Sequence, residues 1–143
     1  MAAAGRGLIV NVASAAAFMS APCMGAYNAS KAAVVALSET LQQELAPHGV
    51  HVAVAMTGFF RTRLLEHARA PAGARQAAER LMERSKLDAA DVARELLERA
   101  AAGEIYVVLP AGYRWLWRFK RLAPRSFMRW LGRQSMRCLP QGG

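Results

Sequence analysis

The stretch "GLIVNVASAAAFMSAPCMGAYNASK", residues 7–31, changes from a β-branched apolar run to an alanine-rich pattern. The run "GLIVNVAS", residues 7–14, is typical of a short strand buried on both faces. From about Gly25 to Ala46, apolar residues recur at steps of three and four, which predicts an amphipathic helix that ends at Pro47 and Gly49. The positions expected to carry its apolar pattern are Ala29, Ala32, Ala33, Ala36, Leu37, Leu41 and Leu45.

The same alternation continues downstream of this helix. "VHVAVAM", residues 50–56, is a second candidate for a buried strand, and two helices are expected over residues 73–86 and 88–102. "EIYVVLP", residues 104–110, predicts a third strand. Strand, helix, strand, helices and strand is the order of an α/β fold with a parallel sheet and right-handed crossovers.

The positive charge is concentrated at the C-terminal end. Of the net charge of +9, residues 1–110 contribute +1 and residues 111–143 contribute +8, with no acidic residue among the latter. Arginines alternate there with Trp115, Trp117, Phe119, Phe127 and Trp130. Two short helices broken at Pro124 are expected, and such a pattern suits an anionic membrane surface. A cap over a substrate pocket and a solvated basic extension are the alternatives; a nucleic-acid partner is not expected.

Composition and cysteine content limit the class of protein and the cellular compartment that the sequence fits. With 54% hydrophobic and 20% charged residues, the chain has the composition of one globular domain. Its two cysteines, Cys23 and Cys138, are far apart and form no metal-ligand spacing, so neither a disulfide framework nor a metal site is expected. Asn11 and Ser14 interrupt the N-terminal apolar run, which argues against a signal peptide. No uninterrupted run is long enough to span a membrane. We expect a cytoplasmic protein, with peripheral membrane contact through residues 111–143 as the alternative.

Tyr27 and Lys31 are the candidate chemical groups. They are four residues apart at the start of the expected helix, so both side chains lie on one face, one turn apart. A tyrosine side chain ordinarily ionises near pH 10 and is a poor base at neutral pH, so a nearby ammonium is needed to stabilise its phenolate. Ser14, at the carboxyl end of the first strand, can hold a substrate oxygen against the phenol.

With these residues, positions 7–62 resemble the catalytic half of the short-chain dehydrogenase/reductase family. "YNASK" fits the family pattern Y-x-x-x-K, and Ser14 lies 13 residues before Tyr27, at the spacing of the family's catalytic serine. The strand that leads into "TGFFRT" follows at the expected place. The resemblance implies a partial Rossmann-type sheet of three parallel strands. Residues 1–110 would form the C-terminal half of an NAD(P)-binding domain, and residues 111–143 a basic aromatic extension.

The resemblance also implies the reaction. Hydride would pass between a nicotinamide of NAD or NADP and the carbon of a small alcohol or carbonyl substrate, while Tyr27 gives or takes the proton and Ser14 orients the substrate. Lys31 would also bind the nicotinamide ribose. Gly58 and Thr62 match the family's Pro-Gly-x-x-x-Thr segment, although Thr57 stands at the proline position, and Thr62 would reach the cofactor's carboxamide.

The large aromatic residues after the second strand leave two interpretations open. Phe59 and Phe60 follow a strand's carboxyl end, so they could face an apolar substrate or pack into the core.

One motif of the family does not occur in this sequence. The glycine-rich turn T-G-x-x-x-G-x-G, which lets the backbone approach a pyrophosphate, does not occur before Ser14. We therefore expect the C-terminal part of an enzyme that is a homo-oligomer when intact, with the edge of the first strand open to association. We expect the 143 residues alone to bind dinucleotide weakly or not at all. The alternative is a truncated, non-catalytic remnant that acts as an interaction or membrane-surface module.

Overall fold

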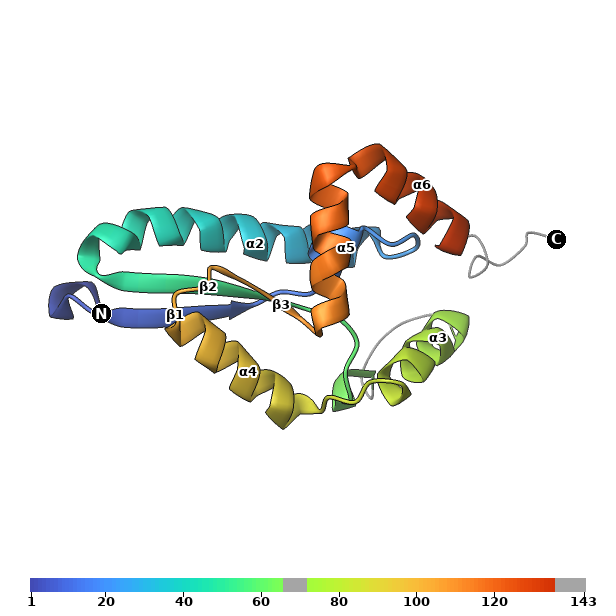
Figure 1. Cartoon of the computed structure of the whole chain (residues 1–143), viewed down its shortest axis with the longest axis horizontal. Helices are drawn as coiled ribbons and strands as arrows, with labels where there is room; N and C mark the ends of the chain where they lie inside the picture. The colour runs from blue at the N-terminus through green and yellow to red at the C-terminus, as the bar shows by residue number, and fades with distance from the viewer. Residues whose placement is uncertain (66–71, 136–143) are drawn as a thin grey trace.

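A parallel sheet of three strands forms the centre of the computed structural model, which describes residues 1–65 and 72–135. The strands are β1 (Gly7–Val12), β2 (Val50–Thr57) and β3 (Tyr106–Leu109), in the order β1-β2-β3 (Figure 1). The α/β fold and the three parallel strands predicted from the sequence are thus confirmed.

Helices cover both faces of this sheet. The crossover helix α2 (Gly25–Leu45) packs on one face together with α5 (Ala111–Leu122), and α4 (Ala89–Ala101) covers the other. The remaining helical segments are η1 (Ala2–Ala4), α1 (Ala16–Met19), η2 (Ala46–His48), η3 (Arg63–Leu65), α3 (Ala72–Glu83) and α6 (Pro124–Ser135).

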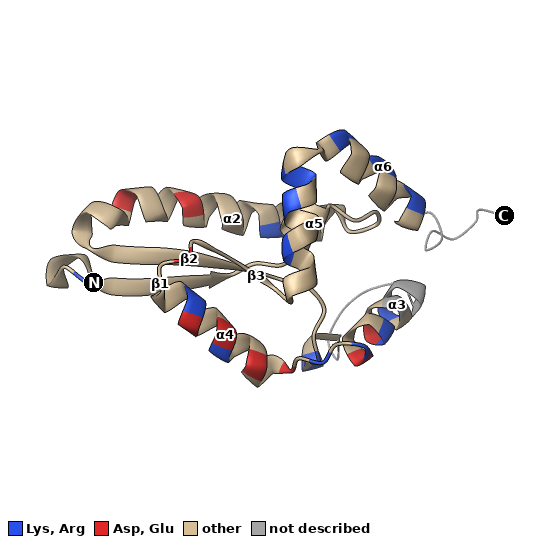
Figure 2. Cartoon of the chain, in the orientation of Figure 1, with Lys and Arg blue, Asp and Glu red and all other residues tan. Residues whose placement is uncertain are grey.

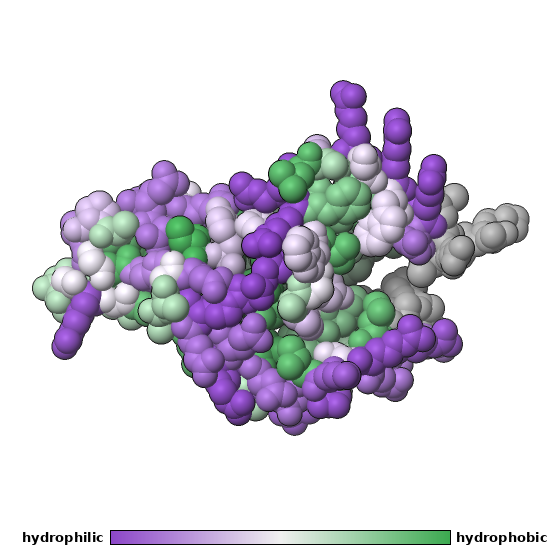
Figure 3. All heavy atoms as spheres, in the orientation of Figure 1, coloured by the Kyte–Doolittle hydropathy of each residue, from purple (hydrophilic) through white to green (hydrophobic). Residues whose placement is uncertain are grey.

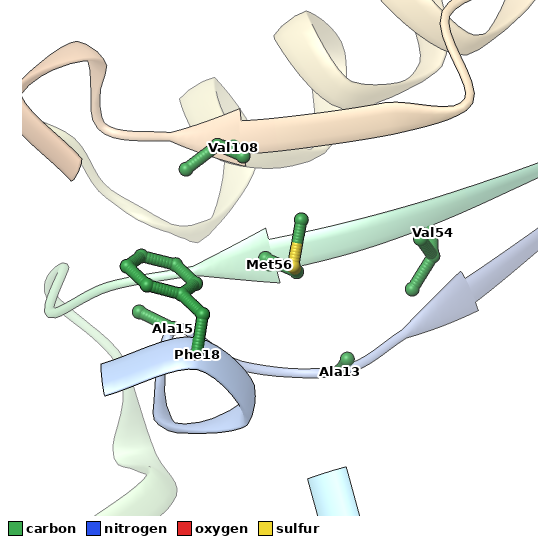
Figure 4. Close-up of a cluster of buried hydrophobic side chains, with 6 residues drawn as sticks. All are labelled: Ala13, Ala15, Phe18, Val54, Met56 and Val108. Atoms are coloured by element: carbon green, nitrogen blue, oxygen red, sulfur yellow. The ribbon is translucent and has the colours of Figure 1, made fainter. Parts of the chain in front are cut away.

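Alternate residues of the central strand divide the core into two clusters. On the α2 side, Val54 and Met56 pack with Val108 and with the segment that follows β1, as Figure 4 shows. On the α4 side, Ala55 packs with Val92 and Leu96. Because both faces of β2 are covered, almost every residue of the strand is apolar and buried, which is why the sequence lacks an apolar-polar alternation there.

The apolar face expected for α2 is wrong at five of its seven positions, and only Leu41 and Leu45 are half-buried. Ala29, Ala32, Ala33, Ala36 and Leu37 are exposed, and Leu37 is 56% exposed. The residues that face the sheet include Val34, Val35 and the fully buried Ser38. The reason is that α2 carries apolar residues around most of its circumference, so periodicity alone could not select the side that contacts the sheet.

A polar pair fixes the orientation of α2 instead. The Asn11 side-chain amide, on β1, donates to Ser38 Oγ over 3.0 Å, and Ser38 Oγ donates to the carbonyl of Val34 over 2.6 Å. A buried amide requires such a partner, because leaving it unpaired costs free energy. The turn of α2 that carries Ser38 must therefore face β1.

The helices after β2 lie where the sequence predicts them, with their ends shifted by one to three residues. Asp88 caps α4 by accepting from the backbone N–H groups of Ala90 and Asp91 at 2.9 Å, and Asp91 completes a capping box. The break at Pro124 is confirmed, and Pro124 becomes the first residue of α6, where its missing N–H has no cost. Cys138 lies outside the described residues.

Candidate active site

The carboxyl ends of the three strands meet at one edge of the sheet. Ser14 lies two residues beyond β1, Gly58 follows β2 directly, and Pro110 follows β3 directly. The N-terminal end of α2 reaches the same edge, because a crossover helix runs antiparallel to the strands that it connects. Parallel α/β sheets bind their ligands at this edge.

Ser14 is held between the ends of β1 and β2. Its hydroxyl accepts from the backbone N–H of Ala16 over 3.2 Å and lies 3.5 Å from the carbonyl oxygen of Thr57, toward which it can donate. The backbone N–H groups of Ala13 and Ala15 bond to β2 at 2.8 Å, so the ladder continues past the end of β1. The half-buried Ser14 side chain is consequently fixed by backbone on both sides.

Tyr27 and Lys31 lie side by side in the first turns of α2. The Lys31 ammonium is 5.8 Å from the centre of the Tyr27 ring, as the spacing of four residues requires. Tyr27 is 36% exposed and Lys31 is half-buried, so the phenol is open to a bound molecule. A phenol and an ammonium in this arrangement can exchange a proton with a substrate oxygen.

Asn28, next to Tyr27, ties the start of α2 to the preceding loop. Its side-chain amide donates to the carbonyl of Ala21 over 2.8 Å. Its Oδ1 atom is buried and has no hydrogen-bond partner within residues 1–65 and 72–135. Sequence reasoning did not single out Asn28, because an asparagine inside a helical pattern carries no distinctive signal by itself.

Gly58 is in close contact with an aromatic ring. A Cβ atom at this position would overlap with ring atoms of Tyr113, so any residue larger than glycine would require the ring to move. The Tyr113 hydroxyl accepts from the backbone N–H of Phe59 over 3.4 Å. Burial raises the pKa of the Tyr113 phenol above its ordinary value of 10.0. The sequence analysis missed Tyr113, although an aromatic residue shortly after the third strand is positioned to reach this edge.

Two open cavities lie beside this edge. Arg61, Thr62, Arg63, Leu65, Arg75, Glu79, Met82 and Glu83 line one of about 300 Å³. Phe59, Leu81, Arg84, Ser85, Lys86, Leu87, Pro110 and Tyr113 line one of about 390 Å³. Phe59 thus faces a cavity, whereas Phe60 packs against the core on the α4 side.

The predicted site residues do not all line one cavity. Thr62 is exposed and lines the smaller cavity, and Ser14, Tyr27 and Lys31 line neither of the two. The structure brings Tyr27 together with Lys31, and Ser14 together with the end of β2. Thr62 lies five residues beyond β2, on the α3 side of the edge.

The chain is similar in sequence to known proteins over lengths from 57 to 138 residues. The family model described as short chain dehydrogenase matches residues 1–73, just over half of the 143 residues. Human 11-beta-hydroxysteroid dehydrogenase type 2 is 51% identical over 57 residues, which cover 40% of this chain and 14% of that protein. The 11-beta-hydroxysteroid dehydrogenase A of Sesamum indicum is 32% identical over 138 residues, which cover 90% of this chain and 38% of that protein.

Solved structures match most of the fold. A short-chain dehydrogenase from Sphingobium yanoikuyae, solved in complex with NADPH, has a TM-score of 0.61 and 25% sequence identity. That match covers 90% of this chain and 47% of the other chain. The chain therefore spans about half the length of this solved structure, and less than two-fifths of the two curated relatives.

Proposed function

Since the chain belongs to the short-chain dehydrogenase family, we propose that it supplies the catalytic residues of an NAD(P)-dependent oxidoreductase that interconverts an alcohol and a carbonyl. The observation that carries this proposal is the Tyr27–Lys31 pair, with the ammonium 5.8 Å from the ring centre and the phenol open to solvent. Ser14 supports it, because it lies at the same edge of the sheet on a rigid backbone.

In the proposed reaction the proton moves through Tyr27. During oxidation the Tyr27 Oη atom takes the proton of the substrate hydroxyl, and during reduction it returns a proton to the carbonyl oxygen. Lys31 lies one turn along the same face of α2 and keeps its ammonium beside the Tyr27 ring. Ser14 donates a hydrogen bond to the substrate oxygen and so orients it toward the phenol.

The nicotinamide end of a dinucleotide fits the residues present. Lys31 makes no ion pair with an acidic residue in the described part of the chain, so its donors can bind ribose hydroxyls. The exposed Thr62 hydroxyl can bind a carboxamide, whereas the Tyr113 ring takes the space beside Gly58. When bound, NAD or NADP accepts or supplies the hydride. The NADPH in the solved relative supports this choice of cofactor.

An apolar alcohol or carbonyl is the substrate class we favour. Phe59, Leu87 and Tyr113 give the larger cavity an apolar wall, and two of the curated relatives are named for hydroxysteroids. A homo-oligomeric state of the whole enzyme, a cytoplasmic location and the division of the chain near residue 110 stay predictions. The alternative function remains a non-catalytic interaction module.

The test is turnover with matched substitutions. Oxidation of apolar secondary alcohols is followed by the absorbance of reduced cofactor, with NAD and NADP in parallel. Tyr27→Phe and Lys31→Met should lower kcat at least about 100-fold, because general acid-base catalysis contributes on that order. Tyr106→Phe and Arg94→Met are the controls and should retain activity, since neither residue lies beside Tyr27 or lines either cavity. Activity that survives Tyr27→Phe contradicts the proposed mechanism.

A further inference from the structure

Helices α5 and α6 form a fixed pair at one end of the domain. The rings of Phe119 and Phe127 lie 5.6 Å apart edge to face, and Phe127 lies 5.7 Å from Trp130. Phe127 is completely buried in this cluster. The ammonium of Lys120, on α5, donates to the carbonyl of Phe18 over 2.5 Å. The inner sides of both helices are thus occupied, and α6 extends away from the sheet (Figure 1).

The outer sides carry positive charge only. Residues 111–135 contain seven Lys and Arg residues and no acidic residue, and Figure 2 shows basic positions alone on these helices. Arg125, Arg129 and Arg133 are exposed and four residues apart, so they form one row along α6. Long hydrophilic side chains project outward from this helix in Figure 3. None of these three arginines forms an ion pair within the described residues.

Large apolar side chains are exposed beside these arginines. Leu122, at the corner between α5 and α6, is 86% exposed, and Trp115 is 69% exposed. Trp115, Arg118 and Leu122 share one side of α5, because they are separated by three and four residues. The Arg118 guanidinium lies 5.4 Å from the Trp115 ring, so the cation and the aromatic side chain act together. Leu122 is the last residue of α5 and Arg125 lies in the first turn of α6, so the two sets of side chains follow one another along the chain.

We propose that Trp115, Arg118, Leu122, Arg125, Arg129 and Arg133, here named the basic aromatic face, dock on an anionic lipid membrane surface. Arginines bind lipid phosphates, while Leu122 and Trp115 leave water for the interfacial region of the bilayer. None of the helices in the described residues is both long and apolar enough to cross a membrane, so the pair would lie on the surface. This inference is independent of the proposed catalytic activity.

Charge and shape favour lipid over the other occupants. A second copy of the chain docked on the same face would bring two sets of arginines together with no acidic residue between them. A nucleic acid would satisfy the arginines but would give the fully outward Leu122 side chain no apolar environment. An anionic lipid surface accommodates both kinds of side chain.

The three tryptophans of the chain provide the readout, because Trp115, Trp117 and Trp130 all lie in α5 and α6. The 143-residue chain is mixed with vesicles of phosphatidylcholine alone, or of phosphatidylcholine and phosphatidylglycerol in equal parts. Sedimentation measures binding, and tryptophan emission reports transfer into the interface. We expect binding and a blue shift with the anionic vesicles, and little of either with phosphatidylcholine alone. No binding to the anionic vesicles would overturn the proposal.

Matched variants distinguish binding through this face from binding through positive charge anywhere on the chain. The triple variant Arg125→Gln, Arg129→Gln, Arg133→Gln should weaken binding roughly 100-fold, at about fivefold for each arginine near the surface. The control triple Arg6→Gln, Arg80→Gln, Arg94→Gln removes the same charge from exposed positions outside the two helices and should leave binding nearly unchanged. Equal losses in the two triples would contradict the assignment to α6.

The apolar contribution is tested by Leu122→Gln, which leaves the charge unchanged. We expect weaker binding and a smaller blue shift, because the leucine no longer enters the interface. If Leu122→Gln binds like the parent chain and a short single-stranded oligonucleotide displaces the vesicles, the face is a nucleic-acid site and the lipid assignment is wrong. Thermal unfolding of each variant confirms that the domain remains folded.

Discussion

The ring of Tyr113 lies against Gly58, so close that a Cβ atom on residue 58 would overlap with the ring. This contact joins the ends of β2 and α5 at the edge that carries the candidate site. Gly58→Ala should therefore lower the free energy of unfolding by about 1–3 kcal/mol, because the methyl group forces the ring to move. Urea denaturation measures the difference.

Gly112→Ala is the control for this substitution. Gly112 is also near this edge, at the start of α5, but no atom lies within 4 Å of the position that an alanine methyl group would take there. Alanine favours a helix, so Gly112→Ala should be neutral or stabilising by up to about 1 kcal/mol. A Gly58→Ala variant as stable as Gly112→Ala would contradict the close packing.

Tyr113 should also make the folded chain less stable at alkaline pH. Because burial raises the pKa of its phenol above 10.0 in the folded chain, folding favours the protonated form. The resulting stabilisation is complete below about pH 10 and disappears as the pH rises through the higher pKa of the folded state. Tyr113→Phe removes this titration, so its melting temperature should fall less steeply above about pH 10. If the melting temperature of Tyr113→Phe falls with pH as steeply as that of the parent chain, the alkaline loss of stability does not come from Tyr113.

The Asn11–Ser38 hydrogen bond should contribute measurably to the free energy of unfolding. Ser38→Ala removes the acceptor of the Asn11 amide inside the α2–β1 interface. We expect a loss of about 1–3 kcal/mol in the free energy of unfolding, the usual cost of an unpaired buried polar group. Thr40→Ala, on the exposed side of the same helix, removes a hydroxyl that bonds only to the helix backbone and should change stability little. Equal effects of the two substitutions would mean that the buried pair does not orient α2.

The Arg99–Glu104 pair should make stability depend on acid pH. Two hydrogen bonds of 2.9 and 2.6 Å connect the guanidinium to the carboxylate, and they hold the pKa of Glu104 below its ordinary value of 4.5. This stabilisation is present above pH 4.5 and is lost as the pH falls through the lower pKa of the folded state. Glu104→Gln should therefore reduce the drop in melting temperature between neutral pH and about pH 3. Glu98→Gln, on α4 and outside this ion pair, should leave the drop unchanged.

The strands and helices themselves could be predicted from the sequence. The apolar runs indicated three parallel strands, and the helix expected over residues 88–102 and the break expected at Pro124 placed helix ends to within a few residues. The spacing of four residues between Tyr27 and Lys31 also determined that their side chains meet. All of these features depend on residues that are close in sequence, where helix and strand periodicity set the geometry.

Only the tertiary structure decided which side of α2 faces the sheet, because that choice depends on the Asn11–Ser38 bond across 27 residues. It likewise revealed Tyr113 against Gly58, a contact between segments that are far apart in the sequence. No periodic pattern encodes such contacts, since they arise when separate elements pack against one another. The sequence by itself thus determined the order of the elements and the proximity of Tyr27 to Lys31, and packing determined how those elements are oriented around the candidate site.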